Sequence, residues 1–249
     1  MIFRQLFDAE SSTFTYLVGD ERAGVCALVD TVREQNDRDE RLVADLWLRL
    51  VYVVETHVHA DHVTAAGELR RRTGARTLVA REDGPSCADE GLVEGDEVAV
   101  GSVVLRALAT PGHTAGCLSY RVGERVGDDR PRFDRVLTGD ALLVRGCGRT
   151  DFQCGDPARL FDSVTEKLFA LDASTLVYPA HDYRGMTVTT IGEERRLNPR
   201  LAGKTKGEFV DLMRALNLPR PRRIDEALPA NRSCGDVRAE PAPPKPIEG

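Results

Sequence analysis

The stretch Glu55-Thr56-His57-Val58-His59-Ala60-Asp61-His62 places four potential metal ligands within six residues. It follows the run Leu50-Val51-Tyr52-Val53-Val54, which is apolar on both alternating faces, as in a strand buried on both sides of a sheet. His57 and His59 share a parity, and Asp61 joins them on one side if the chain stays extended beyond the strand. The stretch therefore predicts a metal site at the carboxyl end of this strand.

The remaining histidines of the chain also stand where apolar runs end. Of only five histidines, three lie in the opening stretch. His113 follows Pro111 and Gly112, which favour a turn that lifts the histidine away from the sheet edge. Asp140 and His181 each stand at the end of a short apolar strand. The candidate ligands are thus His57, His59, Asp61, His62, His113, Asp140 and His181.

The periodicity of the chain predicts an α+β fold. The ligand stretch joins a strand to a helix and a further strand, which is the βαβ pattern and places a site at the strand's carboxyl end. Strands are expected at residues 14–18, 25–30, 50–55, 76–80, 97–100, 103–108, 117–122, 135–140 and 175–183. Helices are expected at residues 39–48, from 63, from 157 after Asp156 as N-cap, at 193–197 and at 208–216. Two strand-rich halves, before and after about residue 95, favour an αββα sandwich.

One domain is expected over residues 1–237, with a short helical part at its end. Residues 238–249 are rich in proline and are expected to be disordered. The 249 residues are 41% hydrophobic, which suffices for a substantial core.

Charge and hydropathy exclude several classes of partner. A net charge of −6 gives no basic field that would attract nucleic acid or an anionic membrane. No apolar window approaches the roughly 18 residues that span a bilayer, and the amino terminus lacks a basic region followed by an apolar core. We therefore expect a globular protein without a nucleic-acid or membrane partner.

The spacing of the cysteines indicates whether the protein occupies a reducing or an oxidising compartment. The six cysteines include no CxxC pair, which argues against a zinc ribbon and against a disulfide framework. A reducing cytoplasm fits this pattern best. The cysteines are Cys26, Cys87, Cys117, Cys147, Cys154 and Cys234.

Nitrogen and oxygen donors without a thiolate suit zinc, iron or manganese at a catalytic site. The THVHADH stretch, with His113, Asp140 and His181, resembles the metallo-β-lactamase superfamily over most of the chain. Two arrangements known in that superfamily remain open. In a dinuclear hydrolase similar to glyoxalase II, Asp140 would bridge two metals, one held by His57, His59 and His113 and the other by Asp61, His62 and His181. In a mononuclear site, only His57, His113 and Asp140 would bind the metal.

The segment Arg145-Gly146-Cys147-Gly148-Arg149-Thr150-Asp151-Phe152-Gln153 favours the mononuclear arrangement, because it resembles the persulfide dioxygenases. Residues 180–183, 197–200, 216–219 and 229–235 are similar to the same family. A member that kept the fold and lost its chemistry is disfavoured, since every ligand position is retained. Glyoxalase II relatives also carry a longer helical C-terminal domain, for which this chain has little room.

The resemblance implies oxidation of glutathione persulfide by O2 and water to sulfite and glutathione, with one Fe(2+) per chain. His59, Asp61, His62 and His181 would then surround the iron site without binding the metal. The two carboxylates of glutathione would need cationic and hydroxyl donors, for which Arg149, Tyr183, Thr114 and Arg200 are the candidates. Cys147 is expected to be structural, whereas Cys234 is either a buried structural thiol or a reactive one. The persulfide would come from a separate protein, and similar proteins are commonly homodimers.

Overall fold

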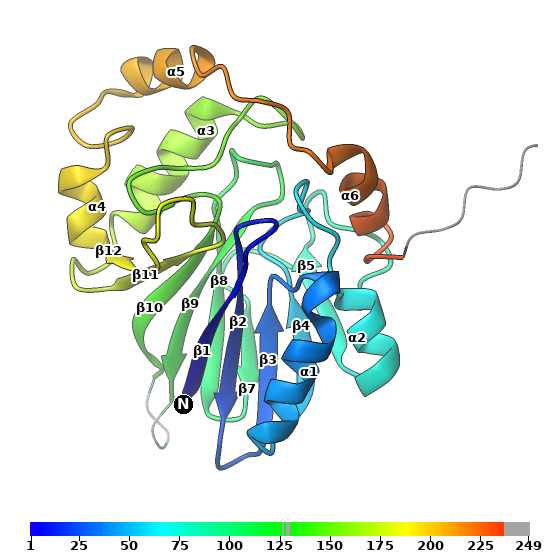
Figure 1. Cartoon of the computed structure of the whole chain (residues 1–249). Coiled ribbons are helices and arrows are strands. Elements are labelled where there is room, and N and C mark those ends of the chain that lie inside the picture. Colours follow the sequence, from blue (N-terminus) through cyan, green and yellow to red (C-terminus); the bar gives the residue numbers. More distant parts are fainter. Residues whose placement is uncertain (126, 128–129, 237–249) are drawn as a thin grey trace, which may run out of the picture.

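The computed structural model describes residues 1–125, 127 and 130–236. Two mixed sheets of six strands each form its centre (Figure 1). In the first sheet the strands run in the order β1-β2-β3-β4-β5-β6, and in the second in the order β12-β11-β10-β9-β8-β7. The first sheet comprises β1 (Ile2–Asp8), β2 (Thr13–Asp20), β3 (Val25–Val29), β4 (Arg49–Val54), β5 (Arg76–Ala80) and β6 (Glu90–Leu92). The second comprises β7 (Glu97–Val100), β8 (Val103–Ala109), β9 (Leu118–Glu124), β10 (Arg132–Gly139), β11 (Leu176–Pro179) and β12 (Thr189–Thr190).

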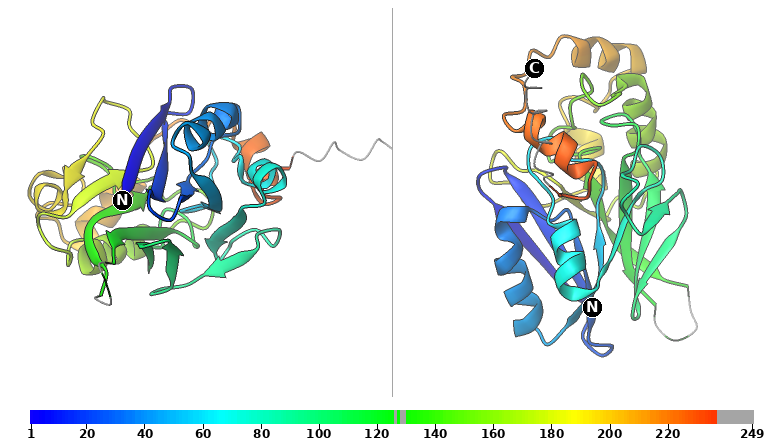
Figure 2. Two further views of the ribbon diagram at one scale, coloured as in Figure 1. Left: turned by 90° about the horizontal axis from the view of Figure 1, so that it is seen from below. Right: turned by 90° about the vertical axis from the view of Figure 1, so that its right-hand side faces the viewer.

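Helices flank the two sheets (Figure 2). They are α1 (Asn36–Asp45), α2 (Ala66–Thr73), α3 (Pro157–Asp162), which a π-helical turn continues over Ser163–Leu168, α4 (Ile191–Leu197), α5 (Lys206–Arg214) and α6 (Ile224–Asn231). Of these, α5 and α6 lie beyond the sheet ends, at the end of the sandwich where the loops gather (Figure 1 and Figure 2). Val43 of α1 and Leu69 of α2 pack on the first sheet. Leu160 of α3 packs on the second sheet, and Phe209 of α5 packs against Phe161 of α3, with ring centroids 5.5 Å apart. The predicted αββα sandwich, with its halves divided near residue 95, is confirmed.

Buried side chains on the inner faces form the core between the sheets, and two of them join the sheets through hydrogen bonds. Tyr16 of β2 donates its hydroxyl hydrogen to the Pro179 carbonyl, at 2.5 Å, at the end of β11. Tyr120 of β9 donates to the Glu55 carbonyl, at 3.0 Å, just after β4. Each bond satisfies a hydroxyl that would be costly to bury unpaired. Both lie at the carboxyl ends of strands that lead to candidate ligands.

The predicted βαβ unit is confirmed, since β4 and β5 pair in parallel on either side of α2. The helix begins at Ala66, three residues later than expected. Thr64 accounts for the delay, because its hydroxyl accepts from the Ala66 amide at 3.1 Å and its own amide donates to Asn231 Oδ1 at 2.9 Å. The first helix, α1, begins at Asn36, three residues earlier than expected.

Two further elements differ from the sequence prediction. The strand expected at residues 175–183 ends at Pro179, and a short strand, β12, follows it along the chain and pairs antiparallel with it. Helix α6 was not expected, since its apolar pattern is weak and Pro229 lies inside it. Asp156 caps α3 as predicted, with Oδ1 accepting from the Ala158 and Arg159 amides. The proposed domain boundary at residue 237 and the tail at 238–249 lie outside the described residues.

One disulfide corrects the cysteine analysis. Cys87 and Cys234 are bonded although 147 residues separate them. Spacing gives no hint of this pair because only tertiary packing brings α6 against the loop between β5 and β6. Cys234 is therefore bonded, and is neither a buried structural thiol nor a reactive one. Cys147 is a free thiol, 3% exposed, in the core with Met213 of α5.

Candidate metal centre

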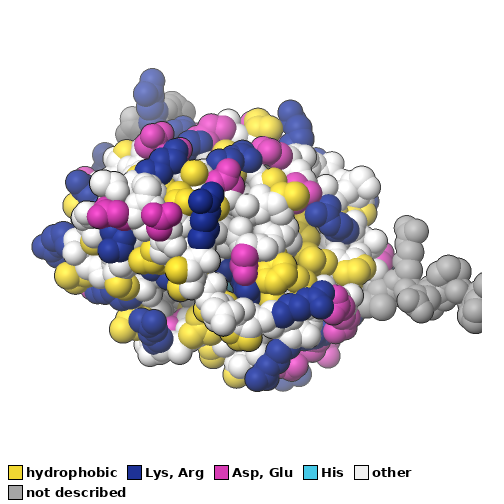
Figure 3. Space-filling model, turned by 90° about the horizontal axis from the view of Figure 1, so that it is seen from above, with side chains coloured by type: hydrophobic (Ala, Val, Ile, Leu, Met, Phe, Trp, Pro, Cys, Tyr) yellow, Lys and Arg dark blue, Asp and Glu magenta, His cyan; other side chains and the backbone are white. Residues whose placement is uncertain are grey.

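Loops at one end of the two sheets bring the seven candidate ligands together. The ligand stretch follows β4, His113 lies in the β8–β9 connection, and Asp140 and His181 follow β10 and β11. All five histidines are at most 9% exposed. In a view of this end of the molecule, basic and acidic side chains are intermixed and no histidine of the described residues reaches the surface (Figure 3). The centre is therefore buried beneath the surface charges.

His57, His113 and Asp140 form one group of potential ligands. One ligand atom from each lies within 4.8 Å of the others. His113 Nε2 is 3.5 Å from Asp140 Oδ2, and the rings of His57 and His113 stand at 83° with their centroids 4.9 Å apart. Two imidazole nitrogens and a carboxylate oxygen at this spacing fit a single metal ion.

A hydrogen-bonded chain orients the His57 ring. The Thr56 hydroxyl donates its one hydrogen to Asp30 Oδ2 at 2.9 Å, so its oxygen accepts from His57 Nδ1, also at 2.9 Å. The Thr56 amide donates to Asp30 Oδ1 at 2.7 Å. This arrangement fixes the tautomer and leaves His57 Nε2 free for a metal.

A backbone carbonyl orients His113 in the same way. His113 Nδ1 donates to the Arg149 carbonyl at 2.7 Å, which leaves Nε2 free. The approach requires Gly148, because a Cβ there would lie 2.8 Å from His113 Nδ1 and 2.6 Å from the Asp140 carbonyl oxygen. The glycine of the Gly-Cys-Gly-Arg segment thus lets the loop pass close to two ligands.

Electrostatics favour the forms of these residues that bind metals. Burial lowers the pKa of His57 well below its usual value, and the imidazoles of His59 and His113 act in the same direction. Burial alone would raise the pKa of Asp140, but the charge and hydrogen bond of His181 outweigh it and hold that pKa below its usual range. The neutral imidazole and the ionised carboxylate are the states that coordinate metals.

His181 links the two acidic residues of the centre. Its Nδ1 lies 2.6 Å from Asp140 Oδ1, and its Nε2 lies 2.9 Å from Asp61 Oδ2. Burial opposes a charge on the ring, but the two carboxylates raise the pKa of His181 well above its usual value. Both nitrogens therefore donate. Thr13 donates a further hydrogen bond to Asp61 at 3.1 Å.

His59, Asp61 and His62 form a second group with ligand atoms within 4.8 Å of one another. Within the described part of the chain, His59 Nδ1 and His62 Nε2 are buried without a hydrogen-bond partner. His59 Nε2 faces Asp30 at 3.2 Å and Glu55 at 3.3 Å. Burial disfavours its charge, yet Asp30 and Glu55 raise the pKa of His59 to about 10. A cation at the second group would therefore have to displace the proton on His59 Nδ1 before that nitrogen could bind it.

The groups of candidate ligands differ from those that strand alternation predicts. His57 and His59 fall into different groups because the chain bends after Val54 instead of staying extended. His59 also belongs to a third group, with Asp30 and Glu55, and its ring stands beside that of His57, with centroids 4.1 Å apart. The dinuclear division of the ligands therefore stays open. The set of His57, His113 and Asp140 is the one that the mononuclear arrangement requires.

Arg149 lies at the edge of the centre with its guanidinium engaged by the protein. It forms two hydrogen bonds with Asp151, at 2.7 and 2.8 Å, and donates to the Pro219 carbonyl at 2.7 Å. The guanidinium also stacks on the Phe152 ring at 4.5 Å. These contacts tie the turn that carries the His113 acceptor to the segment before α6, and a direct role in substrate binding stays a prediction.

The other substrate candidates differ in accessibility. Tyr183 is 69% exposed, and its ring is parallel to that of His181 with the centroids 5.8 Å apart. The Thr114 hydroxyl is buried against Cys117 Sγ at 3.1 Å. Arg200 donates to the Cys147 carbonyl at 2.6 Å. Of these candidates, Tyr183 is the one placed to meet a ligand from solvent.

Sequence reasoning missed the residues that orient the ligands. Asp30 and Thr56 were not singled out, although Asp30 ends an apolar strand in the same way as Asp140. That shared pattern was the available signal. No sequence signal marks Glu55 or Thr13, because their contacts with His59 and Asp61 arise only in the folded chain.

Comparisons with known proteins show the family of this chain. The model of the metallo-beta-lactamase superfamily matches residues 9–181. Persulfide dioxygenase ETHE1 of Homo sapiens is 46% identical over 236 residues, which cover 94% of this chain and 89% of that protein. The crystal structure of ETHE1 from Myxococcus xanthus is 57% identical, covers 95% of this chain and 100% of its own, and superposes with a TM-score of 0.89.

A hydrolase of glutathione thioesters is also similar, at a lower level. Hydroxyacylglutathione hydrolase of Fuscovulum blasticum is 34% identical over 220 residues, which cover 88% of this chain and 81% of that protein. The higher identity to the persulfide dioxygenases extends over more of both chains. The fold, the His and Asp metal site and these likenesses together show that the chain belongs to the persulfide dioxygenase family of the metallo-β-lactamase superfamily.

Proposed function

We propose that this chain is a sulfur dioxygenase that converts glutathione persulfide, O2 and water to glutathione and sulfite at one Fe(2+) per chain. The observation that carries the proposal is the group of His57, His113 and Asp140, two imidazoles and one carboxylate with ligand atoms within 4.8 Å. This donor set is the facial triad of non-haem Fe(II) oxygenases. Ferrous iron held there supplies a redox-active centre with open coordination positions.

The surrounding residues prepare this donor set. Thr56 and the Arg149 carbonyl hold the two rings with Nε2 free. His181 occupies Asp140 Oδ1, so Oδ2 is the oxygen left on the side of His113. Asp61 balances the charge of His181 from its other nitrogen. We assign His59, Asp61, His62 and His181 to orienting the ligands and shaping the field around them.

The glutathione part of the substrate would lie on the exposed side of the centre. Tyr183 offers a hydroxyl and a ring face there, with His181 stacked behind it. Arg149 supports that side indirectly, since its guanidinium holds the turn of residues 149–152. We propose Arg200 and Thr114 as further determinants, acting through the Cys147 carbonyl and the His113 turn that they contact.

Dinuclear hydrolysis of a glutathione thioester is the second candidate function. The observation in its favour is the pair of unpartnered nitrogens on His59 and His62 beside Asp61, among the described residues. Two metals would lower the pKa of a bridging water and make it a nucleophile. The lower identity to the hydroxyacylglutathione hydrolase weighs against this candidate.

Metal analysis of protein purified without added metal separates the two candidates. We expect one iron per chain in the wild type and none in His113→Ala, which should also lose turnover. Tyr183→Phe is the matched control, because it alters an exposed residue beside His181 and should retain the iron. Two metals per chain, together with hydrolysis of S-lactoylglutathione, would refute the dioxygenase.

Location and assembly complete the proposal. We propose a cytoplasmic protein that forms a homodimer. No helix of the described residues is long and apolar enough to cross a membrane. Four of the cysteines are free thiols, in keeping with a reducing compartment, whereas the disulfide between Cys87 and Cys234 is the feature against it. Cell fractionation and light scattering test these two points.

A further inference from the structure

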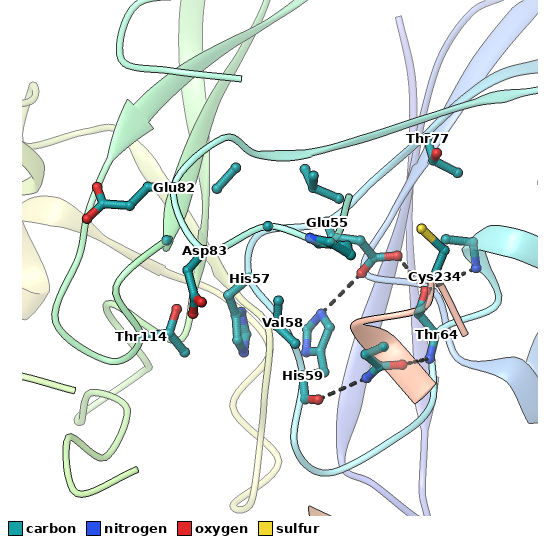
Figure 4. A pocket seen from close by; sticks show the side chains of 17 residues that line it. Glu55, His57, Val58, His59, Thr64, Thr77, Glu82, Asp83, Thr114 and Cys234 are labelled. Atoms are coloured by element: carbon teal, nitrogen blue, oxygen red, sulfur yellow. Dashed lines mark hydrogen bonds and ion pairs between the residues drawn. The ribbon is translucent and has the colours of Figure 1, made fainter. Parts of the chain in front are cut away.

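A small pocket lies directly behind His57, on the inner side of the ligand stretch (Figure 4). It lies between the ends of β4 and β5, the first turn of α2, the end of α6 and the loop that follows β5. About 20 Å³ of it is open to the centre of a water-sized molecule. Since roughly 10–15 Å³ on this measure holds one water, the pocket accommodates one very small molecule and no more.

The surface of this pocket is mostly carbon. Val58, Ala66, Val79 and Ala80 contribute apolar side chains to its wall. Several polar groups along the wall bond to the protein, although His59 Nδ1 has no hydrogen-bond partner among the described residues and Glu55 Oε2 meets only the His59 ring, at 3.3 Å. The Thr64 hydroxyl donates to Glu55 at 2.6 Å.

Asn231 shows the same behaviour at the end of the pocket formed by α6. Its Nδ2 donates to the carbonyls of His59 and His62 at 2.9 and 2.8 Å, and its Oδ1 accepts from Thr64. Because its polar atoms are used in this way, Asn231 presents little to a polar ligand. An apolar molecule is favoured over water in such a space.

The loop after β5 forms the outer wall of the pocket, and its Glu82 is exposed at the surface. A Cβ on Gly116 would lie 1.9 Å from the Glu82 carbonyl oxygen, and a Cβ on Gly84 would lie 1.9 Å from the Ala80 carbonyl oxygen. The loop after β5 therefore packs backbone against backbone. An ion pair between Asp83 and Arg232, at 3.1 Å, ties this loop to the end of α6, as does the disulfide.

The pocket meets the metal centre at a single ligand. Of the described residues that line it, His57 is the one that belongs to the group with His113 and Asp140. Tyr183 and Arg149, on the side proposed for glutathione, are not part of its wall. The pocket and the side proposed for glutathione are therefore lined by different residues.

We propose that this pocket binds O2 beside His57 and supplies it to the metal centre. The inference rests on the proposed function, which requires O2. An uncharged diatomic molecule fits a carbon-lined space of this volume. A tripeptide persulfide with two carboxylates is too large for it, and burying its charges there would be costly.

Xenon is the probe for the binding step, because it occupies dry apolar cavities and does not depend on turnover. Crystals of the iron-containing protein under xenon pressure should show one xenon atom between Val58, Val79 and Ala80. Ala80→Leu extends a side chain into the same space and should abolish this peak. Ala80→Val is the smaller replacement, for use if the leucine variant does not fold.

Kinetics test the supply step. Ala80→Leu adds three carbons, so the KM for O2 should rise by at least about tenfold, the least that a single methylene in an apolar pocket is worth. The KM for glutathione persulfide should stay unchanged. Ala107→Val is the matched control, since Ala107 is equally buried in the core between the sheets but does not line the pocket. It should bind xenon and keep both KM values.

Absence of xenon from the wild-type pocket would overturn the proposal. So would an Ala80→Leu variant that excludes xenon but keeps the wild-type KM for O2. If the wild type binds xenon and consumes no O2 with glutathione persulfide, the proposed function itself has failed, and the oxygen role of the pocket fails with it. The xenon experiment therefore separates a wrong pocket from a wrong reaction.

Discussion

Replacing Thr56 by valine removes one hydroxyl from the chain that joins Asp30 to His57. The change is nearly isosteric at a residue that is 1% exposed, so packing is preserved. Two hydrogen bonds of 2.9 Å are lost, one to Asp30 Oδ2 and one from His57 Nδ1. Leaving these buried atoms unpaired should cost about 1–3 kcal/mol of unfolding free energy. Metal affinity should fall by about 10- to 100-fold, because the partner that fixes the ring of a ligand is gone.

Thr15→Val provides the matched control. The Thr15 hydroxyl is also buried and donates to Asp30, but to its backbone carbonyl at 2.8 Å and without contact to His57. Urea unfolding should show a similar loss of stability in both variants. Competition with a chelator should show weaker iron binding in Thr56→Val alone. Equal iron affinity in the two variants would refute the assignment of Thr56 and Asp30 as the groups that orient His57.

Three further changes test other parts of the structure. Cys87→Ser removes a cross-link over 147 residues and should lower the unfolding free energy by about 2–5 kcal/mol, and a reductant should shift the urea curve of the wild type but not of the variant. The Ser102 amide holds the pKa of Asp20 at about 2, below its ordinary value of 3.8. The ionised Asp20 therefore adds about 1–2 kcal/mol to the unfolding free energy. This contribution is complete above about pH 4 and is lost as the pH falls towards 2. Asp20→Asn should therefore flatten that part of the stability profile, and an unchanged profile would contradict the assignment. Arg149→Ala should raise the KM for glutathione persulfide and leave the iron content intact. Arg149→Lys should show the same raised KM, because one ammonium cannot replace the two parallel hydrogen bonds to Asp151. An unaltered KM would remove Arg149 from the substrate side.

The strands that lead to the ligands were predictable, because a strand buried on both faces has a continuous apolar sequence. The segments before His57 and Asp140 have this form, and the structure places both at one end of the sandwich. The turn that presents His113 was predictable from Pro111 and Gly112. Local sequence therefore carried the identity of the ligands and their common location.

Contacts between distant segments were beyond the reach of the sequence. The pairing of Cys87 with Cys234 depends on where α6 packs, and α6 itself has little apolar periodicity. The position of Asp30 beside Thr56 depends on the parallel pairing of β3 and β4. The assignment of His59 to a different group from His57 depends on bends that no spacing rule describes.

Arg149 illustrates a different difficulty. Its residue type predicted a donor for a carboxylate, and the structure does give it one, namely Asp151 of the same turn. An arginine that meets an internal carboxylate and one that meets a substrate look the same in sequence. Only the partners of the guanidinium separate the two roles, which is why the kinetic test of Arg149 is informative.

The most direct test of the central claim is the stoichiometry of the reaction. Oxygen uptake and sulfite formation should be measured together with glutathione persulfide as substrate, using protein that carries its own iron. The account predicts one O2 consumed for each sulfite formed, and neither signal in His113→Ala. Hydrolysis of S-lactoylglutathione by the wild type, without any oxygen uptake on persulfide, would contradict it.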